Sequence, residues 1–436
     1  QGRLLAERRD GAQTSHYRYD ALGRMIGETI QLAGLDQPLL TATRYDPDTG
    51  LVVARKLIDG RLMRIERGDP ATGAAARSLT LQAGWVAAIQ DWAGEHLSES
   101  VGAVLGRWLP SEPVVAAIVI DPFDGLASYT AGNGIETKRS YDIAGRLTKL
   151  DIQKIGQYTY RYGNGPRVRS IDGPNSHAYY HYAGFGRLVQ SAEAGPKLVK
   201  AEYNIPVRDA LGRTLADRDF RYTYTAQGQI DTVSDPAGRP LARYRYNSLG
   251  QRVAKTVMAN SKETTTWTLW QDGNRVAELD EKGNIAAQYL YLTEGQRVTP
   301  IAKLDSEHIH FIHTDHRGAP VAMSDEQQAI VWRANVSAWG SAQPVNAETY
   351  GPASLNFRLP GQYYDEETGL HDNWHRTYDP DTGRYLQPDP LGYPDGPDAY
   401  LYASGDPINR IDANGLYAID VHYYMTYFLA LVSGES

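Results

Sequence analysis

A short pattern of residues recurs along the chain and limits what it can fold into. An aromatic residue is followed by Asp or Asn, two variable residues, Gly, and then Arg or Gln before the next apolar residue. Asp or Asn opens a tight turn by bonding nearby backbone, and Gly takes the left-handed position in that turn. The copies are YRYDALGRMIGE (17–28), RYDPDTGLV (44–52), SYDIAGRLTKL (140–150), RDALGRTLAD (208–217) and YRYNSLGQRVAK (244–255), with weaker ones at 181–190 and 222–233.

The spacing of the turn glycines indicates short strands. They fall at 212, 228, 238 and 250, which fits hairpins with strands of about 5–8 residues. A unit of this size cannot bury its own apolar face, so stacked neighbours must do so. The 30 tyrosines, against 6 phenylalanines, suit half-buried sheet positions, and 42 glycines and 23 prolines punctuate many strands. We therefore predict an all-β fold built as one long twisted sheet of hairpins.

Residues 83–109 depart from this pattern. Trp85, Ile89, Trp92 and further apolar residues recur at mostly three- to four-residue steps, and Pro110 ends the run. We predict a helical insertion packed on the sheet. The alternative interpretation is a plug or a contact for enclosed cargo.

Charge and composition exclude several classes of function. The formal charge of -8, with Lys and Arg scattered, argues against a nucleic-acid partner for this region. The absence of Cys excludes disulfides and cysteine-ligated zinc, and no stretch of 18 uncharged apolar residues predicts a membrane span. The chain begins in mid-pattern without an initiator Met, so we expect a piece of a longer protein.

Histidines gather between 307 and 340, at positions 308, 310, 313 and 316. Two of them alternate along a predicted strand, and no Glu-x-x-His helix lies nearby. We interpret all four as strand and turn residues and predict no metal site.

The C-terminal part of the chain contains the candidate chemistry. FRLPGQYYDEETGLHDNWHRTYDPDTGRYLQ (357–387) leads into PDPLGYPDGPDAYLYASGDPINRIDANGLY (388–417), where Asp389 and Asp412 stand 23 residues apart. Two carboxylates brought close together share a proton, as in an aspartic protease, where one activates water and the other protonates the carbonyl oxygen. Acids that we predict to be turn and surface residues instead are Asp365, Glu366, Asp395 and Asp398.

This combination of repeats and C-terminal motifs resembles the Rhs (YD-repeat) proteins, the polymorphic toxin shells of bacteria. The resemblance implies that the sheet winds into a hollow, cocoon-like shell. It also implies three parts: a YD-repeat β-shell (1–356), a core with an aspartyl autoprotease motif (357–416), and the start of a C-terminal toxin domain (417–436).

The resemblance also assigns the site. Rhs cores end in Pro, four residues, then Asp-Pro-x-Gly-Leu, and the cut follows the leucine. The matching residues are Pro407, Asp412, Gly415 and Leu416, and Pro388 and Asp389 match the upstream Pro-Asp-Pro. The implied catalytic pair is therefore Asp389 and Asp412. The implied cut lies between Leu416 and Tyr417. The departure is Ala413, where the family usually has proline, and we expect it to slow cleavage without removing the pair.

The function implied by the resemblance is a shell that encapsulates its own toxin and cuts itself once, without a cofactor. Its implied partners are the enclosed toxin domain, a secretion-spike protein and an immunity protein. It would be made in the bacterial cytoplasm and delivered into target cells through type VI secretion. Alternatives are the C component of an insecticidal Tc toxin, a non-catalytic YD-repeat adhesion protein, and a glycosidase, for which no second carboxylate pair stands out.

Overall fold

The structure, a computed structural model, describes eleven stretches of the chain. They are residues 6–67, 76–82, 112–121, 125–163, 165–174, 176–193, 206–259, 262–294, 297–345, 353–393 and 396–420. The predicted helical insertion at 83–109, and residues 421–436 of the expected toxin start, lie outside the described residues.

Two large antiparallel sheets contain most of the described strands, and each strand pairs with the next one along the chain. The first sheet consists of β1 (Glu7–Arg9), β2 (Gln13–Tyr19), β3 (Met25–Leu32), β4 (Leu39–Tyr45), β5 (Val52–Lys56), β6 (Leu62–Arg67), β7 (Ala76–Gln82), β8 (Glu112–Asp121), β9 (Gly125–Ala131), β10 (Glu136–Tyr141), β11 (Leu147–Ile152), β12 (Gly156–Tyr162), β13 (Val168–Asp172), β14 (His177–Tyr182) and β15 (Leu188–Glu193). A short 3-10 helix, η2 (Gly184–Gly186), lies between its last two strands.

The second sheet follows the same order. It consists of β16 (Val207–Arg208), β17 (Thr214–Ala216), β18 (Arg221–Tyr224), β19 (Ile230–Ser234), β20 (Pro240–Tyr246), β21 (Arg252–Ala259), β22 (Lys262–Gln271), β23 (Asn274–Leu279), β24 (Ile285–Glu294), β25 (Arg297–Leu304), β26 (Ile309–Thr314), β27 (Pro320–Ser324), β28 (Ile330–Val336) and β29 (Ala342–Pro344). The all-β prediction is confirmed.

The turn pattern explains why neighbouring strands pair. In the β2–β3 turn, the Asp20 carboxylate accepts the backbone N–H groups of Leu22 and Arg24, each at 2.9 Å, and the Arg24 guanidinium at 2.6 Å. Gly23 completes this turn with a φ of 79°. The same Asp–Arg pairing recurs in the β10–β11 turn, where Asp142 contacts Arg146.

The tyrosine before each turn ties one hairpin to the hairpin before it. The Tyr162 hydroxyl donates to the Leu147 carbonyl at 2.8 Å, and the Tyr246 hydroxyl donates to the Ile230 carbonyl at 2.9 Å. The turn arginine of the preceding repeat covers the ring, as Arg146 does over Tyr162 at 4.7 Å. Tyrosine therefore contributes at this position through both its ring and its hydroxyl.

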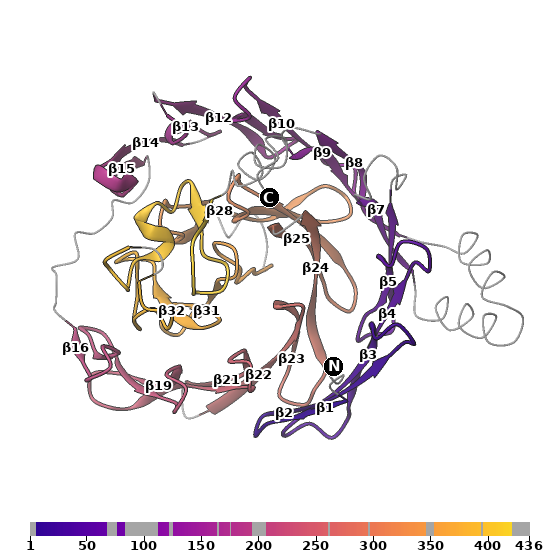
Figure 1. Cartoon of the computed structure of the whole chain (residues 1–436), viewed down its shortest axis with the longest axis vertical. Coiled ribbons are helices and arrows are strands. Elements are labelled where there is room, and N and C mark those ends of the chain that lie inside the picture. Colours follow the sequence, from indigo (N-terminus) through magenta and orange to yellow (C-terminus); the bar gives the residue numbers. More distant parts are fainter. Residues whose placement is uncertain are drawn as a thin grey trace, which may run out of the picture.

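A β-bulge at the same tyrosine bends the wall. The strand register shifts between Arg161 and Tyr162, between Arg245 and Tyr246, and at many equivalent turns. Each bulge increases the local twist and bends its strand, so repeated bulges curl a long sheet. Figure 1 shows the result, a curved wall that surrounds the C-terminal segment drawn in yellow.

The two large sheets are held together by apolar contacts between their faces. Leu81 of β7 and Val115 of β8 belong to the same buried cluster as Leu292 of β24 and Ala302 of β25. Further along the wall, Leu150 of β11 packs in a second cluster with strands of the other sheet. The wall is thus a double layer in these regions.

The interior segment, residues 353–420, forms a small four-stranded sheet inside the wall. Its strands are β30 (Tyr363–Tyr364), β31 (His371–Asn373), β32 (Arg376–Asp379) and β33 (Arg384–Tyr385), followed by the 3-10 helix η3 (Tyr402–Gly405) and the paired strands β34 (Arg410–Ile411) and β35 (Ile419–Asp420). Tyr378, Tyr385 and Tyr402 pack together at its centre and are almost fully buried.

An ionic clamp joins this interior segment to the wall. Its members are Arg252, Lys255 and Arg275 of the wall, with Asp365, Glu367 and Asp372 of the interior segment. Asp365 opens a turn as predicted, since its carbonyl accepts the Gly369 N–H at 2.8 Å, but the prediction that it lies at the surface is wrong, because the residue is only 1% exposed. It is buried because Arg252 and Lys255 of the surrounding wall compensate its charge there.

Candidate active site

Arg376 brings the two predicted aspartates together. Its Nη2 atom lies 2.9 Å from Oδ2 of Asp389 and 3.0 Å from Oδ2 of Asp412. The two carboxylate oxygens are therefore within about 6 Å of each other, the sum of those distances. All three side chains are at most 4% exposed. A guanidinium that contacts both carboxylates offsets one of their two negative charges, which is the charge that a shared proton would offset.

The carboxylate of Asp412 also fixes the loop that contains the predicted cut. Its Oδ1 atom accepts the backbone N–H groups of Gly415 at 2.8 Å and Leu416 at 3.0 Å. Its Oδ2 atom accepts the hydroxyl of Tyr385 at 2.8 Å as well as the Arg376 guanidinium. The side chain thus links residues 412–417, which we call the scissile loop after the predicted cut, to Arg376.

The β31–β32 turn holds the other side of the scissile loop through its carbonyls. Asn373 Nδ2 donates to the Asp412 carbonyl at 2.8 Å, and Arg376 Nε donates to the Gly415 carbonyl at 2.6 Å. Between them, the backbone N–H of His375 donates to the Asn414 carbonyl at 3.3 Å, and the Nδ1 atom of His375 lies 3.0 Å from the same oxygen. Burial lowers the pKa of His375, which favours the neutral imidazole in this position.

Two glycines allow the scissile loop to pack this closely, one in the turn before β30 and one in the loop itself. A Cβ on Gly361, which has a φ of 82°, would lie 1.8 Å from the Ala413 carbonyl oxygen. A Cβ on Gly415, which has a φ of 73°, would lie 2.6 Å from the Asn373 carbonyl oxygen. Both contacts are with backbone atoms, which cannot swing away, so only glycine fits at either position.

Tyr385 contacts both Arg376 and Asp412. Arg376 Cζ lies 3.8 Å from the centre of its ring. Burial and the neighbouring Asp412 carboxylate raise the pKa of Tyr385 well above its usual value. The phenol therefore stays protonated and remains a hydrogen-bond donor to Asp412.

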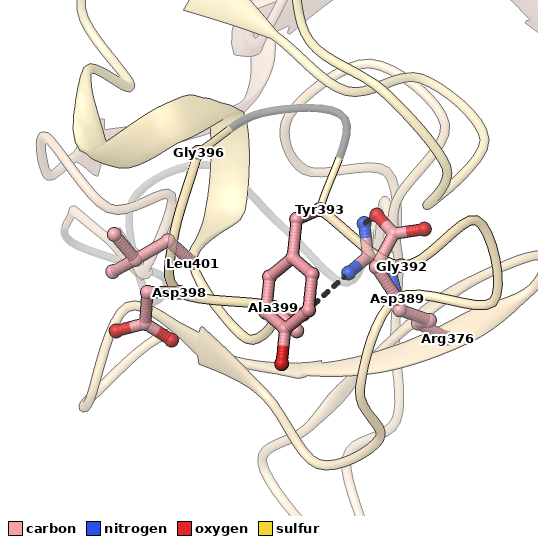
Figure 2. Close-up of a pocket in the computed structure, with 8 residues that line it drawn as sticks. All are labelled: Arg376, Asp389, Gly392, Tyr393, Gly396, Asp398, Ala399 and Leu401. Atoms are coloured by element: carbon pink, nitrogen blue, oxygen red, sulfur yellow. Dashed lines mark hydrogen bonds and ion pairs between the residues drawn. The ribbon is translucent and has the colours of Figure 1, made fainter.

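A small pocket lies beside Asp389, as Figure 2 shows. It has about 170 Å³ of empty space, part of which is open solvent. The residues that line it are Arg376, Asp389, Gly392, Tyr393, Gly396, Asp398, Ala399 and Leu401. Asp389, and not Asp412, is therefore the member of the pair that lines this pocket.

The remaining predicted site residues lie around this centre. Leu416 is half-buried, and Tyr417 is 46% exposed, so the bond between them lies at the surface of the interior segment. Pro407 is buried, and Pro388 is half-buried close to Gly212 of the wall. Asp398, predicted to be a surface residue, is partly buried against Arg384.

Arg376 is the functional residue that sequence reasoning missed. Arginine is common at the turns of this chain. Arg24, Arg146 and Arg213 each follow a turn glycine and pair with the aspartate of the same turn. The distinguishing signal is that Arg376 precedes its Tyr-Asp turn and does not follow the turn glycine. That position leaves its guanidinium free to reach outside its own hairpin.

Two of the four histidines of the 307–340 region, His313 and His316, are buried, whereas His308 is exposed. His313 is fully buried with its Nε2 atom 2.8 Å from the Ser324 hydroxyl, and His316 Nε2 contacts the Ile408 carbonyl at 3.0 Å. Among the residues that the structure describes, no group of three His, Cys, Asp or Glu side chains is placed to hold a metal ion. Nor does any described helix have the length and apolar character needed to cross a bilayer.

Comparison with known proteins gives consistent matches to one architecture. The chain is 29% identical over 316 residues to double-stranded DNA deaminase toxin A of Burkholderia cenocepacia, which is 63% of this chain and 22% of that protein. It is also 29% identical over 334 residues to toxin protein Tse5 of Pseudomonas aeruginosa, covering 63% of this chain and 25% of that protein. The chain thus spans about a quarter of the length of these relatives.

The fold matches a solved shell. A Tc holotoxin pore from Photorhabdus luminescens superposes with a TM-score of 0.70 at 14% identity, over 95% of this chain and 24% of that one. The sequence profile described as Teneurin YD-shell matches residues 125–395, more than half of the chain. The resemblance to YD-repeat proteins is confirmed, and the chain belongs to the teneurin YD-shell family.

Proposed function

We propose that this chain is part of an Rhs-type shell that encloses a C-terminal toxin and cuts itself between Leu416 and Tyr417. The single observation that carries the proposal is the contact of one buried guanidinium, Arg376, with both Asp389 and Asp412, beside the loop that ends at Leu416. The curved wall around this segment and the relatives named as toxins support the enclosing role.

The proposed reaction is hydrolysis of one peptide bond by one water molecule. Asp389, which faces the pocket, takes a proton as the water oxygen adds to the Leu416 carbonyl carbon. The carbonyl oxygen becomes an oxyanion, and the Arg376 guanidinium stabilises it. The intermediate then collapses, the bond to the Tyr417 nitrogen breaks, and the proton passes from Asp389 to that nitrogen. No cofactor is required.

In this proposal the two aspartates have different roles. Asp412 is fully buried and its oxygens already accept four hydrogen bonds, so it orients the scissile loop and Arg376. Asp389 lies at the pocket and is the proton carrier. Arg376 thus supplies the positive charge that a shared proton would supply in a dyad of two carboxylates alone.

Intact mass under denaturing conditions tests the assignment. The parent chain is expected to give two pieces that meet between Leu416 and Tyr417, whereas Asp389→Asn and Asp412→Asn slow the cut at least about a hundredfold. The control is Asp398→Asn, because Asp398 lines the same pocket but pairs with Arg384. Loss of the cut in the control, or an uncut parent, contradicts the proposal.

We further propose that the shell is made in a bacterial cytoplasm and delivers its toxin into target cells, through type VI secretion with a spike protein and an immunity partner. The bacterial toxins among the relatives support this class of function. Export that depends on a type VI spike in the producing strain tests the route. Export with a Tc pore component would place the chain with the Tc toxins, whose shell shares the fold.

A further inference from the structure

Trp374 lies between the scissile loop and the shell wall. It occupies the β31–β32 turn with a φ of 57°, a conformation that is uncommon for a bulky side chain. The residues on either side of it, Asn373, His375 and Arg376, are the ones that hold the carbonyls of the scissile loop. Contacts that hold Trp374 in place therefore also hold the neighbouring residues that bind the scissile loop.

Three wall turns converge on this tryptophan. From the β20–β21 turn, the Leu249 carbonyl accepts the indole N–H at 3.0 Å. From the β18–β19 turn, Gln229 Nε2 donates to the Trp374 carbonyl at 3.3 Å. From the β22–β23 turn, Gly273 lies so close to the indole that a Cβ there would be 3.0 Å from the ring. The conformation of the turn is thus imposed by the second sheet.

Two of these wall turns also contact the first sheet. The Ser248 N–H, in the β20–β21 turn, donates to Asp10 Oδ2 at 2.7 Å. Asp272, in the β22–β23 turn, pairs with Arg55 of β5 at 2.6 Å. A continuous set of contacts therefore runs from the first sheet, through the second sheet and Trp374, to the scissile loop.

We infer that Trp374 is a positioning residue that makes self-cleavage depend on closure of the shell wall. The inference rests on the proposed self-cleavage and adds its regulation. Before the two sheets meet, the wall turns have no fixed place from which to hold Trp374, and the scissile loop is not ordered beside Arg376. Once they meet, the carbonyls of Asp412, Asn414 and Gly415 are held, and the loop is fixed beside Arg376. The cut then follows enclosure of the cargo.

Amide hydrogen exchange of the scissile loop tests the coupling without requiring cleavage. Both variants are made in a chain that carries Asp389→Asn, so that it stays uncut. Trp374→Phe removes the indole N–H but keeps an aromatic ring. Asp10→Asn removes the oxygen that accepts the Ser248 N–H but keeps Oδ1, which accepts the N–H groups of its own turn. Each variant is expected to speed exchange of the Leu416 amide about fivefold, because each loses one neutral or charge-assisted hydrogen bond. Unchanged exchange in both variants overturns the inference.

The matched control removes a contact between the same two sheets at another place. Asn133, in the β9–β10 turn of the first sheet, donates to the Ser324 hydroxyl at 2.8 Å and the Asp325 carbonyl at 2.7 Å in the second sheet. Asn133→Ala is expected to leave exchange of the scissile loop unchanged, because among the described residues its hydrogen bonds to the second sheet are with Ser324, Asp325 and Gln328 and not with the turns that contact Trp374. If Asn133→Ala accelerates exchange as much as Trp374→Phe does, general loosening of the shell explains both, and the inference is wrong.

Cleavage kinetics of the otherwise unmodified chain separate this inference from the proposed function. Trp374→Phe and Asp10→Asn are each expected to lengthen the half-life of the uncut chain about fivefold, while the thermal midpoint falls by no more than about 4 °C. Cleavage at the parent rate in both variants overturns the inference. A parent chain that stays uncut while its loop exchange responds to Trp374→Phe overturns the proposed function and leaves the coupling established.

Discussion

Removing one charge from the ionic clamp, by the substitution Asp365→Asn, is expected to weaken the attachment of the interior segment to the wall. Asp365 accepts both terminal nitrogens of Arg252 at 2.6 and 2.8 Å and Lys255 Nζ at 3.0 Å. It is 1% exposed, so water cannot replace these partners. The substitution leaves Arg252 buried with one fewer compensating charge.

The magnitude follows from the pKa of Asp365 and from the cost of an unpaired charge. Burial raises this pKa, but the attraction of Arg252 and Lys255 outweighs burial and lowers it from 3.8 to about 2. By linkage that shift corresponds to about 2 kcal/mol of stability at neutral pH. Breaking a buried pair by removing one partner costs about 3–5 kcal/mol, so we expect a loss near the lower end.

The pH dependence of this stabilisation has a definite sign. Because the folded pKa of Asp365 is depressed, its contribution is present above the unfolded value of 3.8 and is lost as pH falls through about 2. Glu367 acts in the opposite direction, because burial and the neighbouring Asp365 raise its pKa. As pH falls, protonation of Glu367 therefore removes its repulsion from the Asp365 carboxylate and stabilises the folded chain before Asp365 titrates.

Urea unfolding at neutral pH, followed by tryptophan fluorescence, measures the effect through Trp270 and Trp374 at the same boundary. The control is Asp142→Asn in a wall turn, where Asp142 pairs with Arg146 near the surface, and we expect it to lose less than about 1 kcal/mol. A loss in Asp365→Asn no larger than in the control would refute the reasoning, because it would mean that the clamp is screened by solvent.

Three further predictions concern the loop, the wall and acid stability. Gly361→Ala is expected to stop self-cleavage by pushing the Ala413 carbonyl away, whereas Gly369→Ala, with a similar φ and open space around it, should cleave normally by intact mass. Tyr162→Phe should lower the unfolding free energy by about 1 kcal/mol in urea, through the lost bond to the Leu147 carbonyl, and an unchanged value would contradict the role of the hydroxyl. Burial lowers the pKa of His313, and likewise of His371, to about 3, so the unfolded chain binds protons that the folded chain excludes. Stability should therefore fall as pH drops below about 6.5, by about 2 kcal/mol per histidine at pH 5, and a flat profile in that range would contradict their burial.

Local turn chemistry made the wall predictable from sequence. The glycines at 212, 228, 238 and 250 all have positive φ, and each closes a turn of the kind that the repeated pattern predicts. These turns depend on residues within a few positions of one another, so their signal is visible in the sequence. The tyrosine–carbonyl bonds between neighbouring hairpins follow from the same short period.

Contacts between distant parts of the chain were not predictable in this way. The charge of Asp365 is compensated by Arg252, which lies 113 residues away, so its local sequence suggested an exposed turn. Arg376 joins Asp389 and Asp412 only after the interior segment has folded back on itself. The predicted pairing of the two aspartates came from the family resemblance, and the cut itself stays a prediction.

Hydrolysis of the parent chain in heavy-oxygen water, followed by intact mass of the denatured pieces, tests the central claim most directly. The account predicts that the piece ending at Leu416 gains one heavy oxygen atom and that the piece beginning at Tyr417 gains none, because water attacks the Leu416 carbonyl. A chain that remains whole, a break elsewhere, or unlabelled pieces would contradict it.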